Sequence, residues 1–152
     1  MIKINPQLLQ KDIDARLFML DDGFVYAASA VSENETSRHA GVVLISLDDS
    51  PIEVSISKSK DCAAKSLKGH VIILAPRINR SISIGSGGIL SVHFDPTHPF
   101  YYSMTQSLES EGARVISTRW FDDIRNELNK SDSKVSAKTA LKIFSRCSKA
   151  IL

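Results

Sequence analysis

The segment from Gly69 to Pro96, GHVIILAPRINRSISIGSGGILSVHFDP, constrains the fold of this chain more than any other part of its sequence. An apolar run ends in a proline turn, an alternating strand follows, and a Gly-rich turn leads into a last strand that stops at Asp-Pro. Alternation of apolar and polar residues with a period of two is typical of a half-buried β-strand. The segment therefore predicts short strands joined by turns rather than a βαβ unit.

The sequence before this segment continues the same pattern. Leu17–Leu20 and Phe24–Val31 flank Asp21-Asp22-Gly23, which is a turn signal typical of a β-hairpin. Gly41–Leu47 is an almost unbroken apolar strand, and residues 52–57 alternate strictly, whereas residues 58–69 are a Lys-rich connection. About seven short strands at close spacing predict a sandwich or barrel.

The last third of the chain has a helical character. Trp120, Ile124 and Leu128 recur at helical spacing, and a Ser-Asp-Ser break at 131–133 precedes a second expected helix. The second helix has one expected apolar stripe: Ala137, Ala140, Leu141, Phe144, Cys147 and Ile151. We therefore expect an α+β fold, with a β-barrel over residues 1–100 and two or three helices over residues 101–152 of the same compact unit.

Length and composition favour one soluble domain. The chain has 152 residues, of which 43% are hydrophobic and 24% charged, so it can bury a real core. No apolar run approaches the roughly 20 residues of a membrane helix, and the N-terminal sequence has no secretory signal pattern. We expect a cytoplasmic protein that contacts no membrane, with Cys62 and Cys147 as free thiols.

Positive charge gathers at the C-terminal end. The whole chain carries a net charge of +2, whereas residues 130–152 contain six basic residues and one acidic residue. Five of them recur every four positions beside the apolar stripe: Lys130, Lys134, Lys138, Lys142 and Arg146. They form either a solvated face or a nonspecific contact with phosphate groups. One helix without a helix-turn-helix partner offers little base readout, so we expect no DNA recognition by this chain alone.

Arg80 and His39 are the candidate ligand-binding residues. Arg80 shares its strand face with Ile78 and Ile82 and should point toward the core, where it either pairs internally or binds the carboxylate or phosphate of a ligand. His39 has the parity of Val43 and could line the interior, either satisfied by a backbone carbonyl or as a second polar contact. His93 alternates with apolar residues and is expected to face outward.

Three passages resemble the N-terminal regulatory domain of AraC-type transcription regulators, which is a cupin-like double-stranded β-helix barrel followed by helices. The passages are Arg38–Asp48, with its His39, Val71–Arg80, with its proline turn, and Val92–Pro96, with its closing Asp-Pro. In that family the barrel binds a small effector or mediates dimerisation, and a separate double helix-turn-helix domain binds DNA. This chain ends at Leu152 without room for two such units, so it is either a fragment of a longer regulator or a standalone barrel.

The resemblance implies an effector-sensing and dimerisation domain that is not an enzyme and holds no cofactor or metal. Arg80 stands where a metal-binding cupin would usually place a His, and a guanidinium offers no lone pair to a metal. A homodimer interface is expected at Ala137, Ala140, Leu141 and Phe144, and a small, possibly anionic effector inside the barrel. The alternatives are a small metal-dependent cupin enzyme acting on a carbohydrate or organic acid, and a packed barrel that serves only as a protein-interaction module.

Overall fold

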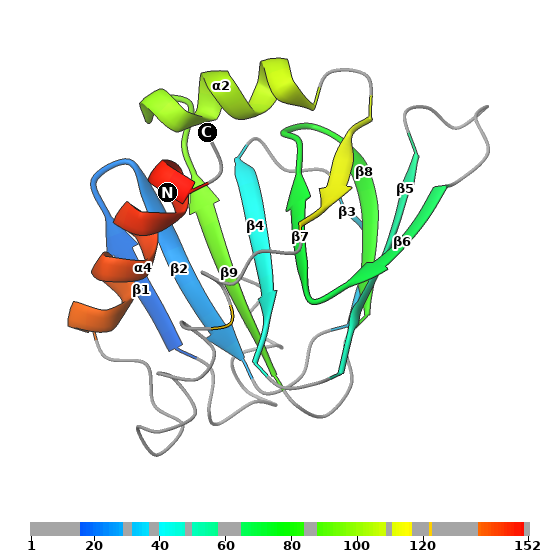
Figure 1. Cartoon of the computed structure of the whole chain (residues 1–152), viewed down its shortest axis with the longest axis horizontal. Coiled ribbons are helices and arrows are strands. Elements are labelled where there is room, and N and C mark those ends of the chain that lie inside the picture. The colour runs from blue at the N-terminus through cyan, green and yellow to red at the C-terminus, as the bar shows by residue number, and fades with distance from the viewer. Residues whose placement is uncertain are drawn as a thin grey trace.

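Two antiparallel sheets and two helices form the part of the chain that the computed structural model describes (Figure 1). The described residues are 16–28, 32–36, 40–47, 50–57, 65–83, 88–108, 111–116, 122 and 137–150. The helix expected over residues 118–128 lies outside this set, except for Asp122. All the strand pairs in the two sheets are antiparallel, which confirms the expectation of a mainly antiparallel β-structure. The two sheets do not close into a barrel among the described residues, so the double-stranded β-helix stays a prediction.

The first sheet has six strands in the order β1-β2-β9-β4-β7-β10. Their bounds are Arg16–Leu20, Gly23–Ala28, Ile89–Phe94, Gly41–Ser46, Val71–Leu74 and Ala113–Val115, respectively. The expected hairpin at Asp21-Asp22 is confirmed, because β1 and β2 pair in register up to Leu20 opposite Gly23. This register places Asp21 and Asp22 in a two-residue turn, the shortest connection that antiparallel strands use.

The second sheet has four strands in the order β3-β8-β5-β6. Their bounds are Ser32–Thr36, Asn79–Ser83, Ile52–Ser57 and Lys65–Gly69. The expected alternation of β5 is confirmed, since Ile52, Val54 and Ile56 are buried while Glu53 is exposed. One face of this sheet is therefore packed and the other faces solvent, as is common in antiparallel sheets.

The first sheet is buried on both faces, which explains why its central strands are so apolar. Its inner face meets the second sheet in what we call the inter-sheet core, which includes Phe24, Val42, Leu44, Val54, Ile72 and Ile82. Its outer face carries the helix-side core, which includes Val25, Val43, Ile73, Val92, Phe94, Phe100 and Phe144. All six residues of β4 and of β9 are buried for this reason.

Two helices contribute to the helix-side core: one lies over β1 and β2, and the other crosses the ends of the strands of the first sheet (Figure 1). Helix α2 (Pro99–Ser107) packs against β4, where a Cβ atom on Gly41 would lie 2.3 Å from the sulfur of Met104. Helix α4 (Ala137–Ala150) packs on β1 and β2, where a Cβ atom on Gly23 would lie 2.6 Å from the ring of Phe144. Both helices thus dock at points where a glycine leaves room for a large side chain.

The apolar stripe of α4 differs from the expected one by a small rotation. Ile143, Phe144 and Cys147 are buried, whereas Leu141 is 53% exposed. The side chains of Ala137 and Ala140 lie outside the described set. The helix therefore buries Ile143, which the sequence pattern left out, in place of Leu141.

Four elements were not expected from the sequence: β3, β6, β10 and α2. Strand β6 lies within the Lys-rich segment and is an edge strand of the second sheet, so it exposes Lys65 and Ser66. Its pairing with β5 makes it a strand, because its own residues lack the apolar alternation of one. Short polar edge strands of this kind are defined by their neighbours rather than by their composition.

Candidate functional site

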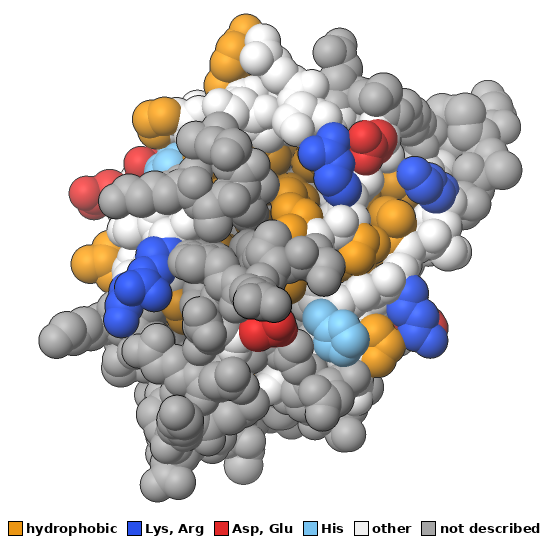
Figure 2. All heavy atoms as spheres, viewed as in Figure 1, with side chains coloured by type: hydrophobic (Ala, Val, Ile, Leu, Met, Phe, Trp, Pro, Cys, Tyr) orange, Lys and Arg blue, Asp and Glu red, His pale blue; other side chains and the backbone are white. Residues whose placement is uncertain are grey.

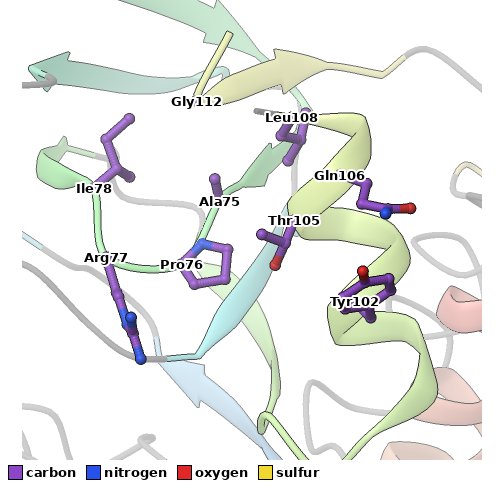
Figure 3. Close-up of a pocket in the computed structure, with 9 residues that line it drawn as sticks. All are labelled: Ala75, Pro76, Arg77, Ile78, Tyr102, Thr105, Gln106, Leu108 and Gly112. Atoms are coloured by element: carbon purple, nitrogen blue, oxygen red, sulfur yellow. The ribbon is translucent and has the colours of Figure 1, made fainter. Parts of the chain in front are cut away.

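A groove of about 510 Å³ lies between helix α2 and the turn that joins β7 to β8 (Figure 3). Its walls come from the turn, from the exposed side of α2, and from the residues that follow α2. The lining residues are Ala75, Pro76, Arg77, Ile78, Tyr102, Thr105, Gln106, Leu108 and Gly112. Apolar side chains form much of this lining, and polar ones come mainly from α2.

The turn side of the groove has an unusual backbone. Pro76 and Arg77 form the turn between β7 and β8, and Arg77 has a φ of 60°. Proline suits the first central position of a turn, whereas a positive φ at the second usually calls for glycine or asparagine. The side chain of Arg77 is exposed and extends away from Leu108 and Gly112 (Figure 3).

Helix α2 is held in place at its start by His98. The Nδ1 atom of His98 accepts a hydrogen bond of 3.0 Å from the backbone N–H of Phe100, so the imidazole caps the helix. Its Nε2 atom lies 3.9 Å from a carboxylate oxygen of Asp22, and its ring packs edge-on against Phe144 of α4 at 5.2 Å. His98 is therefore the point where α2, α4 and the β1–β2 turn meet.

Gly112 lines the groove where the turn side meets the residues that follow α2. This residue has a φ of 75°, and a Cβ atom on it would lie 2.2 Å from the terminal methyl group of Ile78. Its backbone accepts a hydrogen bond from Ala75 N–H and donates one to the carbonyl of Leu108, both at 2.8 Å. The glycine thus ties the turn side of the groove to the end of α2, which no other residue could do at this φ without strain.

Arg114 fastens the same end of α2 from outside. Its guanidinium donates to both carboxylate oxygens of Glu111, at 3.1 and 3.0 Å, and to the carbonyl oxygen of Ser107 at 3.1 Å. These hydrogen bonds from Arg114 hold the pKa of Glu111 below its ordinary value, and those to Glu111 raise the pKa of Arg114. The pair is exposed, so it positions the chain more than it stabilises it.

Arg80 faces the inter-sheet core, as the alternation predicts. It is 2% exposed and lies opposite Ile56 on β5 and Thr36 on β3. Buried guanidinium groups in proteins are paired or hydrogen-bonded, because isolated burial is costly. Its proposed contact with a ligand stays a prediction.

His93 does not face outward, so that expectation was wrong. It is 7% exposed, and its ring stacks on Phe24 of the inter-sheet core with the centroids 3.9 Å apart and the planes 12° apart. Ser91 and Tyr26 are also buried on this inner face, where they are directly opposite each other on β9 and β2. The error arose because β9 is buried on both faces, so alternation could not tell its inner face from its outer one.

The other predicted site residues have separate locations. His39 lies outside the described residues, while Val43 and Ile45, with which parity grouped it, belong to the helix-side core. Phe144 is 5% exposed and packs on Phe94 with the ring centroids 4.7 Å apart, whereas Leu141 remains accessible. The homodimer interface stays a prediction; of its two members with described side chains, Leu141 is accessible and Phe144 is buried.

Within the described ranges, no three His, Cys, Asp or Glu side chains gather in a group that could hold a metal ion. Cys147 is buried in the helix-side core, and this burial raises the pKa of its thiol. No helix among the described residues is both long enough and apolar enough to cross a membrane. Basic and acidic side chains are interspersed over the described part of the face in Figure 2.

Sequence reasoning missed the groove and Arg77. Pro76 signalled a turn, but most proline turns need no positive φ at the next residue, so the sequence could not mark Arg77 as unusual. The other side of the groove belongs to α2, a helix that the sequence did not predict. A surface site formed by two elements distant in sequence leaves no local motif.

No protein-family model matches this chain, and no curated protein matches it. Some solved structures share part of its layout. A protein of Neisseria meningitidis is 10% identical, with a TM-score of 0.41 over 62% of this chain and 100% of its own. CapF, crystallised with the inhibitor 3-isopropenyl-tropolone, is 8% identical, with a TM-score of 0.39 over 68% of this chain and 31% of its own.

A variant of Bacillus subtilis oxalate decarboxylase is 9% identical, with a TM-score of 0.37 over 88% of this chain and 47% of its own. The chain thus spans about half of that enzyme and about a third of CapF. Likenesses this distant say nothing about activity. A function for this protein must therefore be argued from its own residues.

Proposed function

We propose that this protein is a non-catalytic domain that binds a small organic molecule in the groove between α2 and the β7–β8 turn. The observation that carries the proposal is the groove itself. Its volume of about 510 Å³ is within the range of roughly 300–1,000 Å³ that small-molecule sites occupy. Apolar walls with a few polar groups are the usual composition of such sites.

The groove is a better candidate than the space around Arg80. The inter-sheet core around Arg80 is filled by large apolar side chains that are almost fully buried, such as Ile56 and Ile82. The groove offers apolar contact with Ala75, Pro76 and Ile78 and polar contact with Tyr102 and Gln106. A ligand can reach the groove without displacing the core.

Helix α2 supplies a route by which binding could be sensed elsewhere. Its exposed side lines the groove, while its capping residue His98 packs against Phe144 of α4. A ligand that binds one position of α2 better than another would favour that position. The contact between His98 and Phe144 would then carry the change to α4. This link supports a regulatory role rather than simple storage of the ligand.

We place this role in a cupin-like sensory domain of the AraC type. In this proposal the two sheets form the double-stranded β-helix barrel, two copies associate through α4 with Leu141 at the contact, and DNA is bound through a separate domain. The exposed position of Leu141 supports such an association. The protein works in the cytoplasm and needs neither a cofactor nor a metal.

A ligand screen on the purified protein tests the proposal. Thermal shift with small organic acids, their amides, sugars and divalent metal ions, with and without EDTA, should yield at least one metal-independent organic ligand. Thr105→Phe should abolish the response, because the side chain of Thr105 points from α2 toward Pro76 and a larger one would fill the groove (Figure 3).

Met19→Phe is the matched control, because it enlarges an exposed residue on β1, which lies toward the opposite edge of the first sheet from β7. It should leave the response unchanged. Equal responses of the wild type and Thr105→Phe would place the ligand elsewhere and refute the groove. Stabilisation by a divalent metal alone, reversed by EDTA, would instead favour a metal-dependent enzyme.

A further inference from the structure

Arg77 occupies a backbone conformation that its side chain does not favour. Its φ of 60° lies in the left-handed region, which costs a non-glycine residue free energy because Cβ approaches the neighbouring carbonyl oxygen. Glycine at this position of a proline turn would remove the cost. Strained residues of this kind cluster at binding sites and active sites of proteins.

Nothing in the described structure uses the guanidinium of Arg77 for stability. The side chain is exposed, and among the described residues no carboxylate forms an ion pair with it. The ion pair between Arg114 and Glu111 does not involve Arg77. The charge of Arg77 is therefore available to a molecule from solution.

Arg77 is also the charged residue of the groove. The other eight described residues that line the groove are apolar or uncharged, and none of these eight is acidic. Thr105 donates its hydroxyl hydrogen to the carbonyl of Tyr101 at 2.8 Å, so it contributes mainly shape and a methyl group. A ligand thus meets one positive charge at the turn, beside the apolar side chains of Pro76 and Ile78.

We infer that the groove binds a small organic monocarboxylate, with its carboxylate on the Arg77 guanidinium and its apolar body against Pro76 and Ile78. This inference rests on the proposed function and names the class of ligand. The planar guanidinium matches a carboxylate through two parallel hydrogen bonds. A phosphate group carries more charge and usually needs several donors, whereas a single carboxylate is balanced by one arginine.

Matched acid and amide pairs test the inference by isothermal calorimetry. The probes are benzoate with benzamide, phenylacetate with phenylacetamide and hexanoate with hexanamide, together with inorganic phosphate. At least one acid should bind about tenfold or more tightly than its amide, because a charge-assisted pair is stronger than a neutral hydrogen bond. Inorganic phosphate should bind more weakly than that acid.

Three substitutions at Arg77 separate charge from shape. Arg77→Gln should reduce the acid-to-amide preference to about onefold, and Arg77→Lys should keep only part of it, since an ammonium lacks the fork. Arg77→Gly should lose the preference as well, while its ligand-free melting temperature rises because the backbone strain is relieved. This last readout needs no ligand, so it tests the premise by itself.

The outcomes separate the inference from the proposed function. If acids and amides bind equally, or if Arg77→Gln keeps the preference, the carboxylate inference is overturned while the groove still binds ligands. If phosphate binds best, the ligand class is wrong. If none of these acids raises the melting temperature or gives heat, the inference is overturned, whereas the proposed function fails only if the wider screen also yields no ligand that Thr105→Phe abolishes. A lower melting temperature of Arg77→Gly would show that Arg77 serves stability instead.

Discussion

Two arginines three residues apart occupy opposite environments, one at the rim of the groove and one inside the molecule. Arg77 is exposed on a turn with a positive φ, whereas Arg80 is 2% exposed in the inter-sheet core. A substitution of Arg77 therefore alters the surface, whereas a substitution of Arg80 alters the packing of the interior. Their closeness in the sequence therefore says little about which of the two arginines is available to a ligand.

The difference follows from the elements that carry the two residues. Arg80 lies within β8, where alternation alone assigns it to the same face as Ile78 and Ile82. Arg77 lies in the turn before β8, where no periodicity applies and where the second wall comes from α2. The interior residue was the easier one to find, although the rim residue is the better candidate for binding.

The largest expected effect comes from the interior. Arg80→Ala should lower the free energy of unfolding by about 3 kcal/mol, because it removes a fully buried side chain together with its polar contacts. Arg77→Ala should change it by less than about 0.5 kcal/mol, because the side chain is exposed. Urea denaturation of both variants measures the contrast.

Arg80→Met provides a control for volume, since it keeps most of the side-chain length without the charge. If Arg80→Ala unfolds at the same urea concentration as the wild type, the interior assignment of Arg80 is wrong. If Arg77→Ala is instead less stable than Arg80→Ala, then Arg77 and not Arg80 contributes more to the stability of the fold.

A smaller effect is expected at the start of α2, the wall that joins the groove to the rest of the molecule. His98→Ala should be about 1 kcal/mol less stable than His98→Asn, because asparagine retains an acceptor for the backbone N–H of Phe100. Both variants lose the ring contacts with Phe94 and Phe144, so the difference between them isolates the cap. Equal urea midpoints would contradict the capping role of His98.

The smallest effect is expected from Glu111, which directly precedes the groove residue Gly112. Arg114 holds the pKa of Glu111 below its ordinary value of 4.5, so the contribution of this carboxylate is present above that value and is lost as the pH falls through the lowered one. The melting temperatures of wild type and Glu111→Gln should therefore differ slightly at pH 7 and converge below 4.5.

Glu53→Gln is the matched control for Glu111→Gln. Glu53 forms a single exposed pair with Lys68 at 3.4 Å on the second sheet, far from α2 in the chain. Only the Glu111 variant should also weaken ligand binding in the groove, because only it loosens the residues that follow α2. Equal binding by the two variants would restrict Arg114 and Glu111 to a surface role.

Local patterns predicted the strands well where a single rule applied. The Asp21-Asp22 hairpin, the alternation of β5 and the inward direction of Arg80 were all confirmed. The same rules failed for His93, since β9 is buried on both faces. They failed for β6 as well, since its polar residues form a strand only by pairing with β5.

The sequence by itself determined which segments could pair as strands, because hydrophobic period and turn residues act over only a few positions. It also determined that the last helix would be amphipathic, although the docking of the helix on the sheet decided that Ile143 rather than Leu141 is buried. Only the tertiary structure decided where a groove would form, because that depends on the approach of α2 to the turn at Arg77. Such an approach results from long-range packing, and no short stretch of sequence encodes it.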